Sequence, residues 1–518
     1  MDRRSLFLLV LAGLLAVLAG STWPGFPSPN EYARTFAARA MVERGTWEIS
    51  HELNTYGFLE DRARVDDRYY SNKPPGLIWL AVPAVRVMAA VAPDRHPMVD
   101  NYAARLLLST LPALLCAALL GLWLRARERS AAAGIGLLLF GTFWGLSAAF
   151  FWSFAFTGGL VFACAWLLYA QERLPERAAM LLAGFLGALC AVSEYSSAIV
   201  LTALFAPAML VRLRRIIPVA LGMAAPLLML AMYNLACFGT ALTLSNRYDD
   251  AAGYAELGQS AAFGMGLPTA GGMFGLLLSP LLGLFFFSPF LLPALAAPVV
   301  LWRRGERAFA AAVAGCVWLH PLVMAGYANW HGGASLGPRY LGLVLPMFVF
   351  ATLLVPLGRW RGLFWGAATA SLLVHAALRI VPPFAIDDVA TASTIKGWVL
   401  PALREGLVNG LYLSTGGLLV ASAALFALVH LGAVSWLVAT ERRDANVRWL
   451  AGAAAVVLAV QLGVGQVTVR QVTWAWAAMH KWPQERGWEK PVPPVPRAFG
   501  ERYLGELPGA PPAGASPE

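Results

Sequence analysis

Long apolar runs alternate along the chain with short polar segments that are rich in arginine. A helix needs about 20 apolar residues to cross a hydrocarbon layer about 30 Å thick, and it can lie in lipid because it satisfies its own backbone hydrogen bonds. The pattern therefore predicts an all-α polytopic membrane protein. Thirteen runs qualify as spans: 5–22, 102–124, 131–150, 154–170, 178–192, 196–211, 216–236, 274–301, 308–327, 340–357, 363–381, 407–438 and 449–466.

One further run, 77–92, is ambiguous because it is short and carries Pro83 and Arg86. Positive charge in short loops marks the cytoplasmic side of a membrane protein. The arginine clusters therefore indicate whether run 77–92 is a span. If run 77–92 is not a span, one side receives almost every cluster: Arg3/Arg4, Arg125/Arg127/Arg129, Arg173/Arg177, Arg212/Arg214/Arg215, Arg303/Arg304/Arg307, Arg359/Arg361 and Arg442/Arg443/Arg448. We therefore predict thirteen spans, an inside N-terminus, an outside C-terminus, and run 77–92 along the outer interface.

This topology places four substantial segments on the outer side, at 23–101, 237–273, 329–339 and 382–406. The first is the longest, and we expect it to carry juxtamembrane helices and the catalytic residues. Residues 1–466 form the predicted membrane domain. Residues 467–518 are rich in proline and indicate an extended extracytoplasmic tail. The basic and then apolar residues 1–20 would also suit a signal peptide, but we favour a retained first span.

Composition removes several other classes of protein. Hydrophobic residues make up 58% of the chain and charged residues 13%, with a net charge of +10. The cations lie between apolar runs and not on one basic face, which argues against nucleic-acid binding. The five cysteines lie in or at the ends of apolar runs and show neither a disulfide framework nor metal-ligand spacing.

The first outer segment opens with a predicted amphipathic helix that begins near Asn30 and ends at Gly45. Its apolar spacing is typical of a helix that lies at the membrane surface. Glu31, in its first turn, is a candidate general base for an acceptor hydroxyl, if partial burial raises its pKa. The alternative is an acid that complements the helix dipole. Asp61 and Asp66 are further candidate acids in the same loop.

Lys73 follows these acids and precedes two prolines and a glycine. The prolines predict a rigid turn that holds the lysine at headgroup depth, where it could bind a lipid phosphate. A lysine that only anchors the chain at the interface is the alternative.

Other outer segments contribute cations on a side that is otherwise poor in arginine. Arg339 follows three glycines whose backbone N–H groups suit an anion, and arginine can grip a phosphate with two hydrogen bonds. Arg247 lies in the second segment, and Tyr340 adjoins Arg339; both are further candidates for binding the lipid phosphate of a donor. A carboxylate beside Lys73, Arg247 and Arg339 is what transfer from a lipid-linked phosphate donor needs. Three further residues are candidates for donor or acceptor contact: Asn30, Tyr70 and His331.

Several motifs resemble those of bacterial membrane glycosyltransferases of the GT-C class, which includes protein O-mannosyltransferases and lipid A aminoarabinose transferases. The motifs are 69–76 (YYSNKPPG), 193–195 (SEY), 278–280 (LSP), 287–289 (FSP) and 332–340. The resemblance implies a bacterial inner-membrane enzyme with its site facing the periplasm. It implies an inverting sugar transfer from a polyprenyl-phosphate donor to a glycan, lipid or protein acceptor. Where some relatives carry a metal-binding glutamate before the lysine, this chain has Asn72, so a divalent metal is not supported.

Three other functions remain as alternatives. A flippase or transporter for lipid-linked glycans should show mid-span ionisable residues or internal repeats, and we find no repeat. A polysaccharide ligase or polymerase should carry its main outer loop late in the chain, whereas the longest loop here is the first. A structural membrane protein would leave the outer cations without a role.

The predicted topology can be tested by labelling single cysteines in intact cells with a membrane-impermeant reagent. Cysteines at the Asp66 and Ser516 positions should react, and one at the Glu128 position should not. The reverse pattern would contradict the topology.

Overall fold

The computed structural model describes residues 2–20, 28–57, 59–251, 254–260, 262–333, 337–381, 390–400, 431–432, 437–439 and 447–466. The predicted tail 467–518, most of the outer segment 382–406 and most of the run 407–438 lie outside the described residues.

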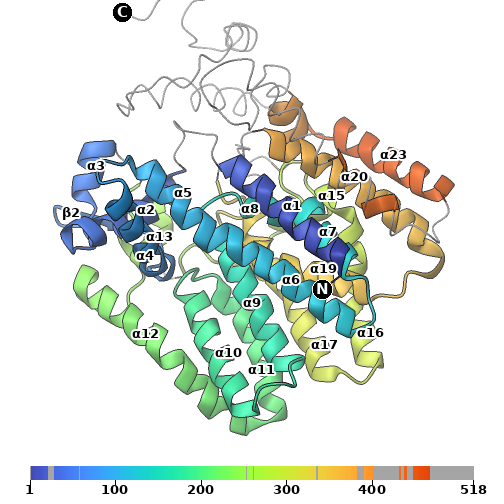
Figure 1. The fold of residues 1–518 in the computed structure, drawn as a ribbon, viewed down its shortest axis with the longest axis horizontal. Helices are drawn as coiled ribbons and strands as arrows, with labels where there is room; N and C mark the ends of the chain where they lie inside the picture. Colours follow the sequence, from blue (N-terminus) through green and yellow to red (C-terminus); the bar gives the residue numbers. More distant parts are fainter. Residues whose placement is uncertain are drawn as a thin grey trace, which may run out of the picture.

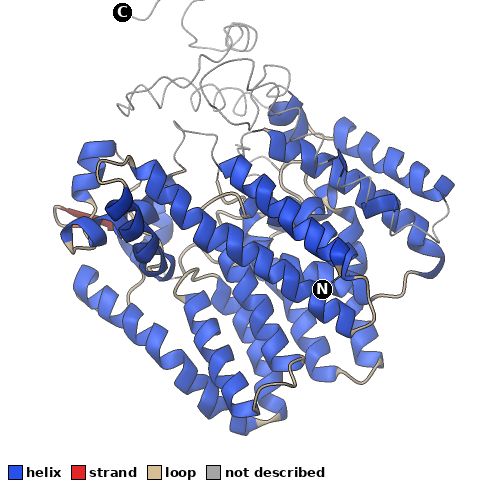
Figure 2. Cartoon of the chain, in the orientation of Figure 1, coloured by secondary structure: helices blue, strands red, loops and turns tan. Residues whose placement is uncertain are grey.

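The described chain is a helical bundle with one two-stranded sheet (Figures 1 and 2). Its first part contains α1 (Arg3–Gly20), α2 (Pro29–Arg44), α3 (Ser50–Tyr56), β1 (Arg62–Val65), β2 (Arg68–Ser71), α4 (Gly76–Val91), α5 (Pro97–Arg105), η1 (Leu106–Thr110), α6 (Leu111–Ala126), α7 (Ala131–Gly141), α8 (Trp144–Ser147), α9 (Ser153–Tyr169), α10 (Glu176–Ala191), α11 (Ser197–Val211), η2 (Leu213–Arg215) and α12 (Ile216–Phe238). Its second part contains η3 (Ser245–Tyr248), α13 (Tyr254–Gln259), α14 (Ala270–Leu277), α15 (Leu284–Phe287), η4 (Pro289–Ala296), α16 (Ala297–Arg303), α17 (Arg307–Ala314), η5 (Gly315–Leu319), α18 (His320–Met324), η6 (Arg339–Val344), α19 (Leu345–Leu354), η7 (Gly358–Trp360), α20 (Arg361–Ile380), η8 (Ile395–Val399) and α23 (Val447–Gly463).

Three helical stretches of the described chain are long and apolar enough to cross a membrane: Pro97–Ala126, Leu213–Phe238 and Arg307–Met324. Seven further apolar helices have only 10–17 residues, so the structure does not confirm the count of thirteen spans. The predicted run 274–301 is the clearest case, because it is divided among α14, α15, η4 and α16. Proline disfavours helical backbone at the residue before it, and both Ser279-Pro280 and Ser288-Pro289 fall at breaks.

Helix α2 begins and ends where the sequence predicts, and Gly45 closes it in the left-handed conformation with φ 67°. Glu31 and the next nine residues are all buried, so other parts of the chain cover most of this helix, and its place at the membrane surface stays a prediction. Its apolar side packs with α4 and α5 in a separate small core that includes Phe36, Leu77 and Ile78. Helix α4, the ambiguous run, is a continuous helix in this cluster.

Ion pairs with buried acids connect α2 to α5 and α3. Arg39 and Arg95 both contact Asp100, at 2.6 and 2.5 Å, and Asp100 is fully buried. Arg44 grips both oxygens of Glu52 on α3. A buried charge is tolerated only when it is paired and hydrogen-bonded, so these contacts determine how α2 is oriented.

A hairpin follows α3. Strands β1 and β2 pair antiparallel, and Asp66, at the turn, has φ 52°. Ala63 of β1 also forms a bridge with Asp249, and Arg62 pairs with Asp250 at 3.0 Å. The first and second outer segments predicted from the sequence therefore meet at this hairpin.

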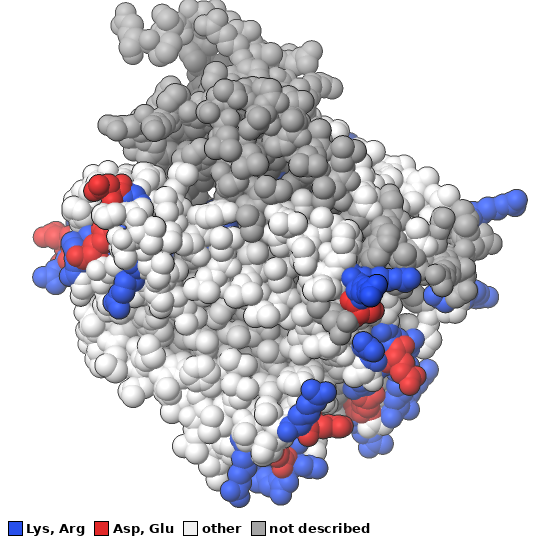
Figure 3. All heavy atoms as spheres, viewed as in Figure 1, with Lys and Arg blue, Asp and Glu red and all other residues white. Residues whose placement is uncertain are grey.

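Charged loops that the arginine pattern assigns to one side also meet in space. Arg127 pairs with Glu306 at 2.7 Å, and Glu176 binds Arg212, Arg214 and Arg215 within 3.0 Å. On the face shown in Figure 3, charged side chains gather near the hairpin and along the opposite rim, with an uncharged belt between them. The structure thus agrees with the grouping of the loops, while the compartment that each group faces stays a prediction.

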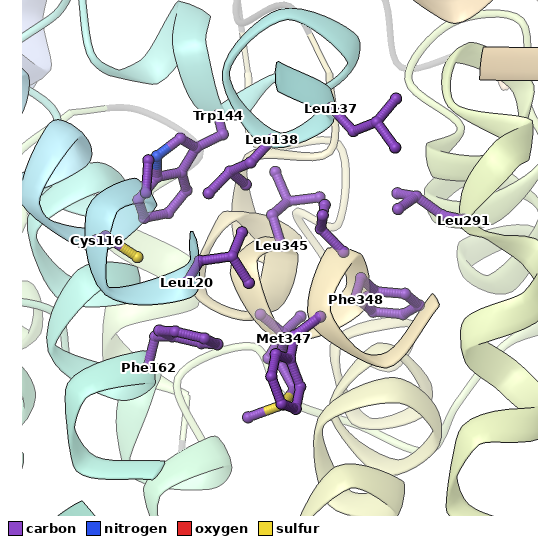
Figure 4. Packing of buried hydrophobic residues seen from close by; sticks show 14 of the residues in the cluster. Cys116, Leu120, Leu137, Leu138, Trp144, Phe162, Leu291, Leu345, Met347 and Phe348 are labelled. Carbon is purple, nitrogen blue, oxygen red and sulfur yellow. The ribbon is translucent and has the colours of Figure 1, made fainter. Parts of the chain in front are cut away.

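The main core lies between α6, α7, α9 and α19. Leu120, Leu138, Trp144, Leu345 and Phe348 are among its buried residues (Figure 4). Residues of α9 and η6 pack in this core. The two elements also carry Ser153 and Arg339, which belong to the candidate site.

Helices α10 and α12 cross at glycines. A Cβ at Gly222 would lie 2.0 Å from the Leu181 carbonyl oxygen, and one at Gly184 would lie 2.1 Å from that of Val219. Small residues let membrane helices approach closely.

We expect Gly222→Leu to lower the free energy of unfolding by at least about 1–3 kcal/mol, because an overpacked interface must separate. Unfolding by SDS in mixed micelles measures this. Gly452→Leu is the matched control, since a Cβ at Gly452 in α23 meets nothing within 4 Å. Equal stability of the two variants would contradict the packing.

Candidate functional site

Lys73 lies in the turn between β2 and α4, and its ammonium contacts the carboxylate of Asp61. The distance from Nζ to Oδ1 is 2.9 Å, and the two side chains are 16% and 17% exposed. Asp61 directly precedes β1 and Lys73 follows β2, so the pairing of the two strands brings the two charges together.

The turn that carries Lys73 is fixed from two directions. Gly76 N–H donates to the Val192 carbonyl at 2.8 Å, and Ser245 Oγ donates to the Asn72 carbonyl at 2.8 Å. A Cβ at Gly76 would lie 2.8 Å from the Val192 oxygen and 2.3 Å from Ser193 Oγ. Glycine at this position therefore lets the turn seat against the loop between α10 and α11.

A second cation, Arg34 on α2, is 1% exposed. Its guanidinium donates to both the carbonyl and the side-chain oxygen of Asn30. Burial lowers the pKa of Arg34 to about 10, while Glu194 and Asp61 act in the opposite direction. At neutral pH Arg34 is therefore a charged group in a site that contains both acids.

Glu194 comes from the loop that Gly76 contacts. Its carboxylate accepts hydrogen bonds from Ser153 Oγ at 2.6 Å and Ser196 Oγ at 2.9 Å. These hydroxyls fix its orientation, and its charge acts on Arg34.

Arg339 reaches the same neighbourhood from the third outer segment. Its guanidinium lies 5.2 Å above the ring of Tyr340 and donates to that hydroxyl at 3.5 Å. A Cβ at Gly332 would lie 2.5 Å from Arg339 Nε, and Gly332 has φ 72°. Glycine thus provides the space that the arginine occupies.

The pKa of Asp61 shows that these cations act together. Burial would raise the pKa of Asp61, but Lys73, Arg339 and Arg34 together hold it below its usual value. Asp61 is therefore ionised at neutral pH. We call Lys73, Arg34, Arg339, Asp61 and Glu194 the charged cluster.

Asp249 lies beside the charged cluster. Asn72 Nδ2 donates to its Oδ2 at 2.9 Å. Burial raises the pKa of Asp249 to about 6, with Asp61 acting in the same direction and Asn72 and Lys73 against it.

The structure gives Glu31 a different setting from the other predicted acids. It is 4% exposed, and its Oε1 accepts the Phe151 backbone N–H at 2.5 Å. Arg105 Nε lies 3.8 Å from the same oxygen. Burial raises the pKa of Glu31, although Arg105, Phe151 and Arg34 oppose this. These contacts tie α2 to the segment between α8 and α9.

Two other predicted site residues lie outside the charged cluster. Asp66 is exposed at the tip of the hairpin. Arg247 donates to carbonyls at the end of α13, with 2.6 Å to that of Gln259, so it closes that short helix.

Three predicted contact residues have supporting positions. Tyr70 packs edge-on against Phe238, with ring centroids 5.8 Å apart. His331 Nδ1 accepts the Gly333 N–H at 3.1 Å in the glycine turn. Asn30 holds Arg34 as described above.

Sequence reasoning missed Arg34, Glu194 and Asp249. The motif at 193–195 and the acids after Arg247 were visible signals, but nothing local showed that they meet Lys73. Arg34 had a clearer signal, because an arginine in the middle of an apolar helical pattern needs buried partners. Among the described residues, no group of three or more histidine, cysteine, aspartate or glutamate side chains is placed to hold a metal ion.

No family model matches the sequence, and no sequence among the curated proteins does. Solved structures with similar chains include ArnT from Cupriavidus metallidurans in the apo state, at 14% identity over 97% of this chain and 91% of that one, with a TM-score of 0.43. ArnT bound to undecaprenyl phosphate is similar at 16% identity over 84% of this chain and 76% of that one, with a TM-score of 0.41. The apo oligosaccharyltransferase of Archaeoglobus fulgidus is similar at 10% identity over 95% of this chain and 60% of that one, with a TM-score of 0.37. These proteins are GT-C glycosyltransferases, the class that the sequence motifs resemble.

Glu31→Ala should lower the free energy of unfolding by about 1–3 kcal/mol, because it leaves the buried Phe151 N–H without an acceptor. Glu31→Gln keeps an oxygen there and should recover most of the stability, as SDS unfolding can show. We expect Glu31→Gln to keep the sugar-transfer activity that the sequence motifs imply. Its loss in a stable Gln variant would support Glu31 as the base.

Proposed function

We propose that this protein is a membrane glycosyltransferase of the GT-C type that transfers a sugar from a polyprenyl-phosphate donor to an extracytoplasmic acceptor. The observation that carries this proposal is the charged cluster. Lys73, Arg34 and Arg339 come from separate parts of the chain and act together on Asp61. The motifs at 69–76 and 332–340 support the same reaction class.

The cations of the cluster suit a phosphodiester. Lys73, Arg34 and Arg339 all act on one carboxylate, that of Asp61, and the phosphodiester that joins a sugar to a polyprenol carries one negative charge. Asp61 partly neutralises Lys73 while no donor is bound. Arginine side chains then offer paired hydrogen bonds to phosphate oxygens.

The proposed reaction breaks the bond between the anomeric carbon and the phosphate oxygen. The acceptor oxygen attacks the anomeric carbon from the opposite face, which inverts its configuration, while a carboxylate takes the acceptor proton. Negative charge grows on the leaving phosphate, where fixed cations stabilise it. Of the three first-loop acids predicted as the base, Asp61 alone lies in the charged cluster.

Lys73→Met and Arg339→Gln should each weaken binding of undecaprenyl phosphate by about 1.5–3 kcal/mol, the value of a hydrogen bond to a charged group. Intrinsic tryptophan fluorescence or native mass spectrometry of the purified protein can measure this. Arg247→Gln is the matched control and should bind normally, because Arg247 donates to α13 carbonyls. Equal affinity in all three variants would remove Lys73 and Arg339 from the site.

The reaction itself is tested with a panel of undecaprenyl-phosphate sugars offered to protein in proteoliposomes with cell-envelope acceptors. Release of undecaprenyl phosphate from at least one donor, and its loss in Lys73→Met, is the expected result. Movement of the lipid across the bilayer without cleavage of any donor would instead favour the flippase.

A further inference from the structure

Asp249 is a buried acid that the reaction described so far does not use. It belongs to the segment after η3, outside the first loop, and is 9% exposed. Its backbone pairs with Ala63 of β1, and its Oδ2 accepts from Asn72, the residue before Lys73. Two independent contacts therefore hold it next to the turn that presents Lys73.

The second oxygen of this carboxylate has no hydrogen bond of ordinary geometry within the described part of the chain, although the backbone N–H of Ala251 helps to lower the pKa of the carboxylate. Asp249 Oδ1 is buried and unpaired, and so is Asn72 Oδ1 beside it. A buried acceptor without a donor costs about 1–3 kcal/mol. Hydroxyl groups of a ligand, or a proton on Asp249, would satisfy these two oxygens.

We propose that Asp249 is the general base of the transfer, and that its Oδ1 takes the proton of the acceptor hydroxyl. This inference rests on the proposed function and assigns the base to the second outer segment. Asn72 acts as a positioning residue: its amide holds Oδ2, which leaves Oδ1 as the oxygen that takes the proton.

The two carboxylates near Lys73 have opposite electrostatic settings. Asp61 stays ionised because three cations act on it, which makes it a weak base and a good counter-ion. Asp249 has a pKa raised to about 6 by burial, close to the value at which a general base is both ionised and basic near neutral pH. Two acids whose pKa values are pushed apart in one site mark different roles.

The cations around Asp249 make their direct contacts with other groups and form no ion pair with it. Lys73 is paired with Asp61 at 2.9 Å, and Arg62 is paired with Asp250 at 3.0 Å. Arg247, two residues before Asp249, turns to the α13 carbonyls. Each described cation that flanks Asp249 therefore has its direct contact with another group, and Lys73 lowers the pKa of Asp249 only through its charge.

The proposed step is balanced. The acceptor O–H bond breaks and its proton passes to Asp249 Oδ1, while the oxygen forms a bond to the anomeric carbon of the donor. The bond from that carbon to the phosphate oxygen breaks, and its electron pair leaves with the polyprenyl phosphate. No other reactant is needed.

The test is the pH profile of undecaprenyl-phosphate release with the donor that the wild-type protein cleaves. Wild-type kcat/KM should fall as the pH drops through about 6, because protonated Asp249 cannot accept a proton. Asp249→Asn keeps the shape and the bond to Asn72, so it should fold and bind undecaprenyl phosphate normally. It should lose about 10²–10⁴-fold in turnover.

Asn72→Ala separates a base from a structural acid. The hydrogen bond from Asn72 holds the pKa of Asp249 down, so its loss should move the acidic limb of the profile to higher pH. A merely structural Asp249 would not produce this shift.

Two results would overturn the inference: wild-type turnover in Asp249→Asn, or an acidic limb that Asn72→Ala leaves in place. Either would leave the glycosyltransferase proposal standing, because the wild-type protein still releases undecaprenyl phosphate. Absence of release by the wild-type protein with every donor would refute the proposed function, and the role of Asp249 with it.

Discussion

The ion pair between Lys73 and Asp61 connects most of the features of this site. It forms because β1 and β2 pair, and it stays in place because Gly76 seats the following turn against the loop after α10. Removing two charges from water is costly, and a buried ion pair is weak evidence for stability. The third and fourth charges, Arg34 and Arg339, add like charge to Lys73. Three cations that all act on one carboxylate are readily explained if an anion binds beside them.

Helix α2 shows how one element supports this site in two ways. Glu31 holds the helix to the segment before α9, and Arg34, one turn later, places a guanidinium in the charged cluster. The ion pairs of Arg39 and Arg44 lie further along the helix and lock its orientation. A change in any of these anchors would therefore move Arg34 as well. The site depends on the packing of α2 against α4 and α5 as much as on its own residues.

Local sequence features predicted the parts of the site that are local. Proline and glycine placed the ends of α2 correctly, and the lysine before two prolines and the arginine after three glycines were recognised from their neighbours. Asp61 was named as one of three acids, but nothing in the sequence singled it out, because its distinction is contact with Lys73 across a hairpin that was not predicted. Asp249 and Glu194 depend on still longer contacts, with residues 177 and 41 positions away. The breaks in run 274–301 were missed because apolar composition outweighed the two Ser-Pro pairs.

An experimental structure of the protein with undecaprenyl phosphate bound would show directly whether the charged cluster holds the phosphate of the donor. If the charged cluster binds the donor, the phosphate lies within hydrogen-bond distance of Lys73 Nζ and of the guanidinium groups of Arg339 and Arg34, with its polyprenyl chain leading toward the apolar helices. A phosphate bound away from these three cations, with the Lys73–Asp61 pair undisturbed, would contradict this role of the cluster.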